Sequence, residues 1–165
     1  MRGYATMIKV LFICHGNICR SPMAEFFMKD LVEKRGLSRH FFIASAATSR
    51  EEIGNPPHPG TRRILAAHGI PCAGKRAVQL RREDYAAYDL LIAMEEYNLS
   101  NMRRLLGGDP EHKCCLLLDF TDHPRAIADP WYTGNFEETF ADISCGCEAL
   151  LAHLLATRPE LAAQS

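Results

Sequence analysis

The chain is organised around the stretch Cys14-His15-Gly16-Asn17-Ile18-Cys19-Arg20-Ser21-Pro22, which follows an apolar run at residues 8–13 and precedes a helical pattern. Glycine and asparagine between its first cysteine and its arginine allow the backbone to curl, so that successive N–H groups point at one anion. The positive end of the following helix adds to that field, with Ser21 as the expected cap and Pro22 in the first turn. This stretch therefore predicts a phosphate-binding loop placed against a sulfur nucleophile.

Hydrophobic periodicity predicts that strands alternate with helices along the rest of the chain. The strand candidates are residues 8–13, 41–45, 88–93 and 114–118, with a weaker one at 75–80, and the helix candidates are residues 22–35, 61–67, 95–106 and 136–157. This alternation is typical of an α/β fold, a three-layer sandwich whose central parallel sheet has helices on both faces. Ligands of such sheets bind beyond the carboxyl ends of the strands, which is where the loop at Cys14 falls.

Composition limits the class of protein. With 165 residues, 47% of them hydrophobic and 24% charged, the chain suits one globular domain. We expect this domain at residues 8–157, after a short extension at 1–7 and before a tail at 158–165. The formal net charge of −1 predicts no broad attraction to nucleic acid or to an anionic membrane, so any recognition of anions must be local.

The cysteines and the apolar runs indicate a compartment. Seven cysteines, an odd number without regular spacing, favour free thiols in a reducing cytoplasm over a disulfide framework. Neither close pair, Cys114-Cys115 or Cys145-x-Cys147, has the spacing of paired zinc ligands, so no metal is expected. The N-terminal segment does not resemble a signal peptide and no stretch approaches ~20 consecutive apolar residues, so we expect no membrane partner.

The loop also indicates a reaction. A free thiol has a pKa of about 8.5, so a thiolate nucleophile needs the loop amides, the helix end and Arg20 to stabilise its charge. Cys14 is expected to attack phosphorus, while the planar guanidinium of Arg20 holds two phosphoryl oxygens. We expect Ser21 to donate a hydrogen bond to the sulfur and Asn17 to fix the loop through its side-chain amide.

A second motif supplies the proton that a leaving alkoxide or phenoxide requires. Residues 128–132 read Ala-Asp-Pro-Trp-Tyr, and Pro130 favours an extended backbone at Asp129. Asp129 is expected to protonate the leaving oxygen and later to activate water. Trp131 and Tyr132 are expected to wall a slot for an aromatic ring. The simpler alternatives are a turn-forming aspartate before proline and aromatic side chains that only pack.

With both motifs considered, the chain closely resembles the low-molecular-weight protein tyrosine phosphatases. Their nucleophile loop is Cys-x5-Arg-Ser, and their acid lies in a late Asp-Pro-aromatic-aromatic loop. The resemblance covers nearly the whole chain and includes, besides the two motifs, Ala24-Glu25, Ser45-Ala46-Ala47-Thr48-Ser49, Gly54-Asn55-Pro56-Pro57, His68-Gly69-Ile70-Pro71, Tyr88-Asp89-Leu90 and Ala93-Met94-Glu95. Thr133, an additional residue before Gly134, favours a bacterial member.

The resemblance implies a four-stranded parallel sheet and a site with neither metal nor cofactor. The catalytic residues that it implies are Cys14, Arg20 and Asp129. The phosphate-binding loop that it implies consists of His15, Gly16, Asn17, Ile18, Cys19 and Arg20. It further implies that the loop is supported by Asn17, Ser21 and Ser45. Cys19 corresponds to a resolving thiol, which would capture an oxidised Cys14 as a disulfide.

Three positions depart from the family pattern. Lys75 stands where family members often have a histidine that supports the loop, which leaves that support open. The rim position after Thr-Ser, often aromatic, holds Arg50 or Glu51, and His15 replaces a common aliphatic residue. We expect Glu51 to join the two aromatic residues of the acid loop in walling the substrate pocket, where its charge would alter peptide preference.

These observations predict a protein tyrosine phosphatase that hydrolyses phosphotyrosine in protein substrates through a phosphocysteine on Cys14 and releases inorganic phosphate. A protein-arginine phosphatase on the same fold is the alternative, although such enzymes typically carry threonine at the position of Ile18. An arsenate reductase would need further spaced thiols, and Cys72 stands alone. A non-catalytic phosphoanion-binding module or a thiol redox sensor would have no use for Asp129.

Overall fold

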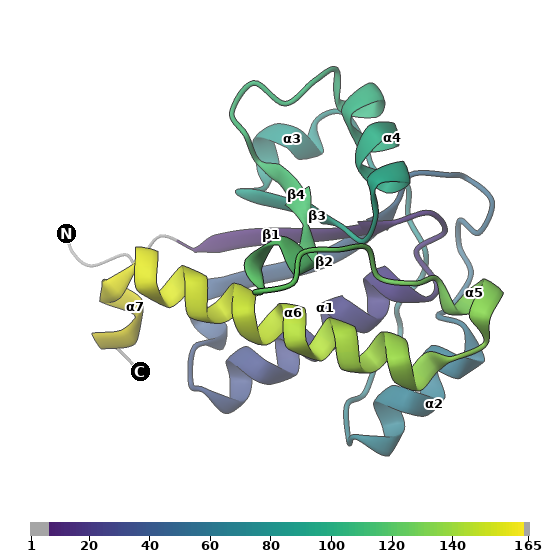
Figure 1. Ribbon diagram of the computed structural model, residues 1–165, viewed down its shortest axis with the longest axis horizontal. Coiled ribbons are helices and arrows are strands. Elements are labelled where there is room, and N and C mark those ends of the chain that lie inside the picture. Colours follow the sequence, from purple (N-terminus) through teal and green to yellow (C-terminus); the bar gives the residue numbers. More distant parts are fainter. Residues whose placement is uncertain (1–6, 164–165) are drawn as a thin grey trace.

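The centre of the molecule is a parallel sheet of four strands. The computed structural model describes residues 7–163. Its strands are β1 (Ile8–Cys14), β2 (Phe41–Ala47), β3 (Leu90–Ala93) and β4 (Cys114–Leu116). They lie in the order β2-β1-β3-β4, and each neighbouring pair is parallel (Figure 1). The predicted α/β fold with a four-stranded parallel sheet is confirmed.

Helices cover both faces of this sheet. One face carries α1 (Arg20–Lys34), α2 (Pro59–Ala67) and α6 (Phe136–Thr157). The opposite face carries α3 (Asp84–Ala87) and α4 (Glu96–Leu106) (Figure 1). The shorter elements are two 3₁₀-helices, η1 (Ser38–His40) and η2 (Leu117–Phe120), and two short helices, α5 (Pro130–Thr133) and α7 (Pro159–Ala163). The molecule is therefore the predicted three-layer sandwich.

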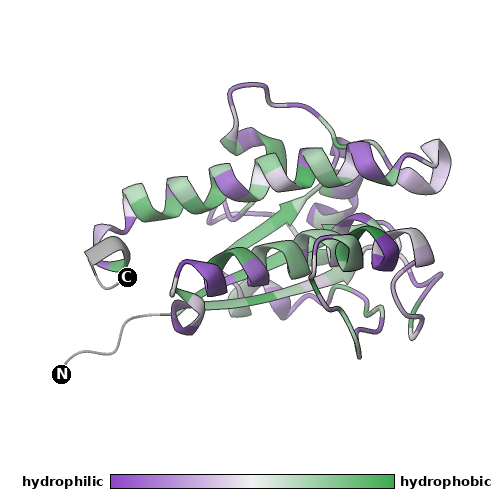
Figure 2. Cartoon of the chain, turned by 90° about the horizontal axis from the view of Figure 1, so that it is seen from below, coloured by the Kyte–Doolittle hydropathy of each residue, from purple (hydrophilic) through white to green (hydrophobic). Residues whose placement is uncertain are grey.

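β1 separates two cores because its side chains alternate between the two faces of the sheet. Val10 and Phe12 belong to the core beneath α1 and α6, whereas Leu11 and Ile13 belong to the core beneath α4. Apart from Lys9, the residues of β1 are buried. Figure 2 shows the strands in hydrophobic colour behind helices of mixed colour. A strand that is apolar on both faces suits a parallel sheet between helices.

α6 closes the larger core. Ile143 and Cys147 are fully buried on the face that packs against α1 and η2. Gly146 lies so near η2 that a Cβ atom there would be 2.5 Å from Leu117 Cγ. Within residues 7–163, α6 is the helix whose length and apolar composition would suit a membrane span. In its most apolar stretch of 18 residues, 44% is buried inside the fold. Packing against the core accounts for its buried apolar face.

The segment at residues 75–80 is not the strand that was predicted. Its contact with the sheet is an isolated parallel bridge between Gln79 and Ala47. The Ala77 N–H donates to Asn55 O at 2.8 Å, and the Val78 N–H donates to Asn17 Oδ1 at 3.1 Å. Because loop residues satisfy these donors, the segment braces the nucleophile loop and does not extend the sheet.

The first helix begins earlier than predicted, and Ser21 does not cap it. α1 starts at Arg20, and its N-cap residue, Cys19, makes no side-chain capping bond. Ser21 lies within the first turn of α1, and its hydroxyl contacts the Cys14 sulfur and the Asn17 amide. The expected capping role of Ser21 is therefore wrong, whereas its expected contact with the sulfur is present.

The two ends of the chain are described in part. Of the expected extension at 1–7, residues 1–6 lie outside the described residues. In the expected tail at 158–165, residues 159–163 form α7, which packs on α6 with Leu161 buried. Residues 164–165 also lie outside the described range.

Candidate active site

Residues that follow the four strands along the chain meet at the carboxyl edge of the sheet, around one pocket and the buried Arg20. Cys14 ends β1, Glu51 lies in the loop after β2, Glu95 follows β3 closely, and Asp129 lies between β4 and α6. The residues that line the pocket are Cys14, His15, Gly16, Ile18, Cys19, Glu51, Glu52, Asp129, Trp131 and Tyr132. The other predicted residues are buried around it, namely Asn17, Arg20, Ser21 and Ser45. The structure thus brings together the residues from both sequence motifs.

Hydrogen-bond donors of the nucleophile loop converge on the sulfur of Cys14. The backbone N–H groups of Asn17 and Ser21 point at Sγ from 3.3 and 3.4 Å. The Ser21 hydroxyl lies 3.0 Å from the same sulfur. Asn17 adopts the left-handed conformation, with φ of 60°, which asparagine tolerates better than most residues. This curled backbone directs two N–H groups at one point, the Cys14 sulfur.

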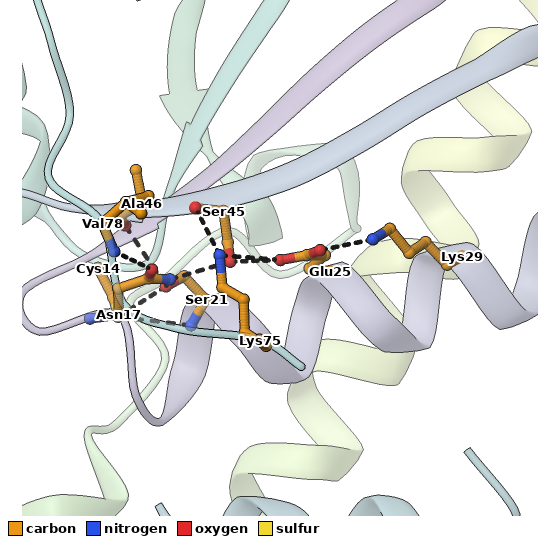
Figure 3. A network of polar contacts seen from close by, with 9 residues as sticks. All are labelled: Cys14, Asn17, Ser21, Glu25, Lys29, Ser45, Ala46, Lys75 and Val78. Atoms are coloured by element: carbon orange, nitrogen blue, oxygen red, sulfur yellow. Dashed lines mark hydrogen bonds and ion pairs between the residues drawn. The ribbon is translucent and has the colours of Figure 1, made fainter. Parts of the chain in front are cut away.

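A chain of polar side chains supports the loop from behind (Figure 3). Asn17 Nδ2 donates to Ser21 Oγ at 2.7 Å and to Ser45 Oγ at 2.9 Å. Ser45 donates its own proton to Glu25 Oε1 at 2.5 Å. Because Ser21 Oγ accepts from Asn17, the Ser21 proton is available to the Cys14 sulfur. The expected support by Asn17, Ser21 and Ser45 is seen in these contacts.

Lys75 extends this network from the loop after α2. Its Nζ donates to the Ser45 carbonyl at 3.0 Å and lies 3.4 Å from Glu25 Oε1. Glu25 is 4% exposed, and its other carboxylate oxygen pairs with Lys29 at 2.6 Å. A buried carboxylate needs such partners to offset its desolvation. The sequence left open what supports the loop in place of the family's histidine. In this structure the buried ion pair between Lys75 and Glu25 provides that support.

Glu25 was not predicted as part of the site, although the sequence contains a signal for it. It occupies a buried position on α1, next to Ala24 and in line with Ser21 and Met28. A carboxylate on the buried side of a helix indicates a charged or hydrogen-bonding partner in the interior.

Arg20 is almost completely buried and is held by three partners. Its Nη1 donates to the Ile127 carbonyl at 2.8 Å, and its Nη2 lies 2.6 Å from Glu95 Oε2 and 3.4 Å from Asp129 Oδ2. The Nε atom is buried and has no hydrogen-bond partner. A donor buried in this way beside an anion-binding loop is suited to an oxygen of a bound phosphoryl group.

Glu95 is the second residue that the sequence did not reveal. It was expected to begin a helix, but it precedes α4 in an extended conformation with φ of −158° and ψ of 166°. This backbone carries its carboxylate to Arg20. Glu95 fixes the guanidinium and balances part of its charge.

The acid motif forms a turn of helix at the pocket mouth. Asp129 Oδ1 accepts from the Trp131 N–H at 3.1 Å and caps α5, while Oδ2 faces Arg20. The Thr139 hydroxyl donates to the Ala128 carbonyl and ties the loop to α6. Trp131 and Tyr132 are 56% and 82% exposed, so they border the pocket and are not part of the core.

The rim of the pocket carries a contact between a histidine and a carboxylate. His15 Nε2 lies 3.3 Å from Glu51 Oε2, and the ring of Tyr97 lies beside His15. Of the two residues considered for the rim position, Glu51 lines the pocket.

Cys19 shares the pocket with Cys14. Burial raises the pKa of the Cys19 thiol to about 12, and the charges of Cys14 and Asp129 add to the rise. Cys19 is therefore protonated at neutral pH. All seven cysteines are free thiols in this structure.

The sequence model of the low molecular weight phosphotyrosine protein phosphatase family matches residues 9–160. The chain is 43% identical over 150 residues to the low molecular weight protein-tyrosine-phosphatase YfkJ of Bacillus subtilis, which covers 90% of this chain and 96% of that protein.

Solved structures give the same result. The crystal structure of YfkJ matches with a TM-score of 0.90 and 42% identity, covering 94% of this chain and 99% of that one. SP-PTP, a low molecular weight protein tyrosine phosphatase from Streptococcus pyogenes, matches with a TM-score of 0.81 and 39% identity over 90% and 93% of the two chains. DARP, a Drosophila arginine phosphatase, matches with a TM-score of 0.80 and 30% identity over 88% and 97%.

The chain therefore belongs to the low molecular weight protein tyrosine phosphatase family. It is a cysteine-dependent protein-tyrosine-phosphatase, whose substrates are phosphoproteins and whose product is phosphate.

Proposed function

We propose that Cys14 and Asp129 hydrolyse phosphotyrosine in proteins in two steps. In the first step Cys14 Sγ attacks phosphorus, the bond to the tyrosine oxygen breaks, and Asp129 gives that oxygen its proton. In the second step Asp129 takes a proton from water, whose oxygen displaces the sulfur and releases inorganic phosphate. The convergence of two N–H groups and the Ser21 hydroxyl on the sulfur carries this proposal, because it stabilises negative charge there both in attack and in departure.

Arg20 and the backbone of residues 15–20 are proposed to bind the phosphoryl oxygens. The partnerless Nε of Arg20 supports this role, and its ion pairs with Glu95 and Asp129 orient the guanidinium before substrate arrives. Trp131, Tyr132 and Glu51 would border the phosphotyrosine ring, since all three line the pocket.

Phosphoarginine is the second candidate substrate, because the chain is 30% identical to an arginine phosphatase from Drosophila. Ile18 favours phosphotyrosine, because an apolar side chain lines the pocket at that position. The two substrates differ in the leaving atom, which is oxygen in phosphotyrosine and nitrogen in phosphoarginine.

The first prediction tests the activity itself. We expect the protein to release phosphate from a phosphotyrosine peptide and from p-nitrophenyl phosphate in the presence of EDTA, because sulfur is the nucleophile and needs no metal. Phosphoarginine should react at least about tenfold more slowly, as a pocket built for another leaving group discriminates against it. Phosphate release is measured by a colorimetric assay. Faster release from phosphoarginine would favour the second candidate, and phosphate binding without any turnover would favour a binding module.

We further propose that Cys19 protects Cys14 from irreversible oxidation. Peroxide would convert the Cys14 thiolate to a sulfenic acid, and the Cys19 thiol would attack that sulfur, forming a disulfide as water leaves. The shared pocket supports this order, because the raised pKa of Cys19 leaves Cys14 as the thiol that peroxide attacks first.

The second prediction follows from this reaction. After treatment with excess peroxide, we expect dithiothreitol to restore most of the activity in the wild type and little in Cys19→Ala. In this variant no second thiol in the pocket captures the sulfenic acid of Cys14, and peroxide oxidises it further to a sulfinic acid that dithiothreitol does not reduce. Peptide mass spectrometry should detect a Cys14–Cys19 linkage in the wild type. Full recovery of Cys19→Ala, with no such linkage in the wild type, would contradict the proposal.

We propose the cytoplasm as the location and phosphotyrosine proteins as the partners, with no nucleic acid and no membrane. The free thiols and the formal net charge of −1 support this assignment. Residues 8–157 are proposed as a single phosphatase domain.

A further inference from the structure

A histidine outside the predicted site contacts both the nucleophile loop and a neighbouring helix. His58 is half-buried and immediately precedes α2. Its backbone N–H donates to the Ile18 carbonyl at 2.8 Å, and its Nδ1 accepts from the Gly60 N–H at 2.9 Å. The second bond makes His58 the N-cap of α2 and requires Nδ1 to be free of a proton.

The imidazole ring of His58 also contacts two aromatic side chains of residues 128–136, which are called the acid segment below. Its centroid lies 5.0 Å from that of Phe136 with the rings tilted by 26°, and 5.8 Å from that of Trp131 with the rings at 83°. Phe136 begins α6, and Trp131 donates its backbone N–H to Asp129 Oδ1. Stacked and edge-on rings at these distances attract each other beyond simple apolar burial. His58 therefore links two parts of the site. Its ring contacts the acid segment, and its backbone N–H holds the nucleophile loop through Ile18.

The base of the acid segment is tied to Arg20 and to Thr139, whereas its tip at residues 131–134 is held mainly by hydrogen bonds within its own backbone. α5 is a single turn, and Gly134 follows it in the left-handed conformation with φ of 71°. Trp131 and Tyr132 are largely exposed. A proton donor must lie within hydrogen-bond reach of the leaving oxygen, and small misplacements of such a group reduce rates strongly. The contact between Trp131 and His58 is thus placed to decide where the Asp129 carboxylate lies.

We propose that His58 is a positioning residue for Asp129, because its ring fixes Trp131 and thereby the carboxylate relative to the loop of Cys14. The proposal rests on the proposed role of Asp129 as the general acid. It separates two functions of one side chain: the Nδ1 acceptor stabilises the start of α2, and the ring orients the acid.

Two variants separate these functions, and a third serves as the control. His58→Asn keeps a side-chain acceptor for the Gly60 N–H and removes the ring. His58→Phe keeps an aromatic ring and removes the acceptor. His153→Asn is the matched control, because the ring of His153 packs against Phe120, with centroids 5.1 Å apart, and His58 packs against Trp131 and Phe136.

The third prediction concerns the leaving group. The measured quantity is the ratio of kcat/KM for p-nitrophenyl phosphate, which has a good leaving group, to kcat/KM for phenyl phosphate, which depends on the acid. We expect His58→Asn to raise this ratio at least about fivefold and His58→Phe to change it by less than about twofold while lowering the Tm. His153→Asn should leave the ratio as it is in the wild type.

An unchanged ratio in His58→Asn would overturn the proposal, and so would an equal rise in His58→Phe, because the cap and not the ring would then orient the acid. Asp129→Asn is measured in parallel. If Asp129→Asn leaves the ratio unchanged, the general acid itself is wrongly assigned and the positioning role falls with it. If Asp129→Asn raises the ratio and His58→Asn does not, only the role of His58 is refuted.

Discussion

Replacing Cys14 with serine is expected to abolish turnover while the protein stays folded and still binds phosphate. A serine hydroxyl fits among the donors that now contact the sulfur, the N–H groups of Asn17 and Ser21. Hydroxyl is a far weaker nucleophile than thiolate at neutral pH, so kcat for p-nitrophenyl phosphate should fall on the order of 10⁴-fold or more. Phosphate binding, measured by calorimetry, should persist because the loop amides and Arg20 remain.

Two further observations make this test decisive. Cys145→Ser replaces an exposed thiol on α6 and should keep full activity. Rapid acid quenching of the wild type with labelled substrate should trap a phosphorus–sulfur adduct on the peptide that contains Cys14. Substantial turnover by Cys14→Ser, or failure to trap any adduct under conditions of steady turnover, would exclude the proposed intermediate.

Removing the carboxylate of Asp129 should have the next largest effect, and its size should depend on the substrate. Asp129→Asn keeps an oxygen that can accept from the Trp131 N–H and cap α5, but it cannot give up a proton. The expected loss in kcat/KM for phenyl phosphate is about 10²- to 10⁴-fold, the range typical of a lost general acid. The loss for p-nitrophenyl phosphate should be much smaller, because its leaving oxygen needs less protonation.

Asp129→Ala provides the comparison for this variant. It also removes the cap of α5 and should be at least as slow, with a lower Tm than Asp129→Asn because the Trp131 N–H loses its acceptor. Equal losses on the good and the poor leaving group would show that Asp129 matters for the shape of the loop and does not act as the acid.

The elements of the fold could be predicted because their signals are local. α6 has the bounds that were predicted, since a continuous apolar stripe follows Asn135, whose side chain accepts from the Glu138 N–H and caps the helix. β1 was equally clear, because its run is apolar on both faces. Residues 75–80 were misassigned because strand propensity does not reveal that Asn17 and Asn55 accept their backbone hydrogen bonds.

The site residues inside the two motifs could be predicted from the sequence itself, whereas Ser45 and Glu51 were expected from the resemblance to the family. The loop from Cys14 to Ser21 and the acid segment carry their chemistry in consecutive residues, so spacing alone places them. Glu95 and Lys75 lie far from the motifs along the chain, and only the fold brings them to Arg20 and Ser45. Glu25 lies on α1 with Arg20, but its partners Ser45 and Lys75 come from distant parts of the sequence. A charged residue has no periodic signal that identifies the opposite charge it will meet after folding.

The site is built from residues that follow all four strands, and this has a consequence for refolding. Residues as distant along the chain as Cys14 and Asp129 come together only when every strand has found its neighbour. Closing such long loops is slow compared with forming local helices. During refolding, helical signal should therefore return before catalysis, and recovered turnover marks the last stage at which the native topology is complete.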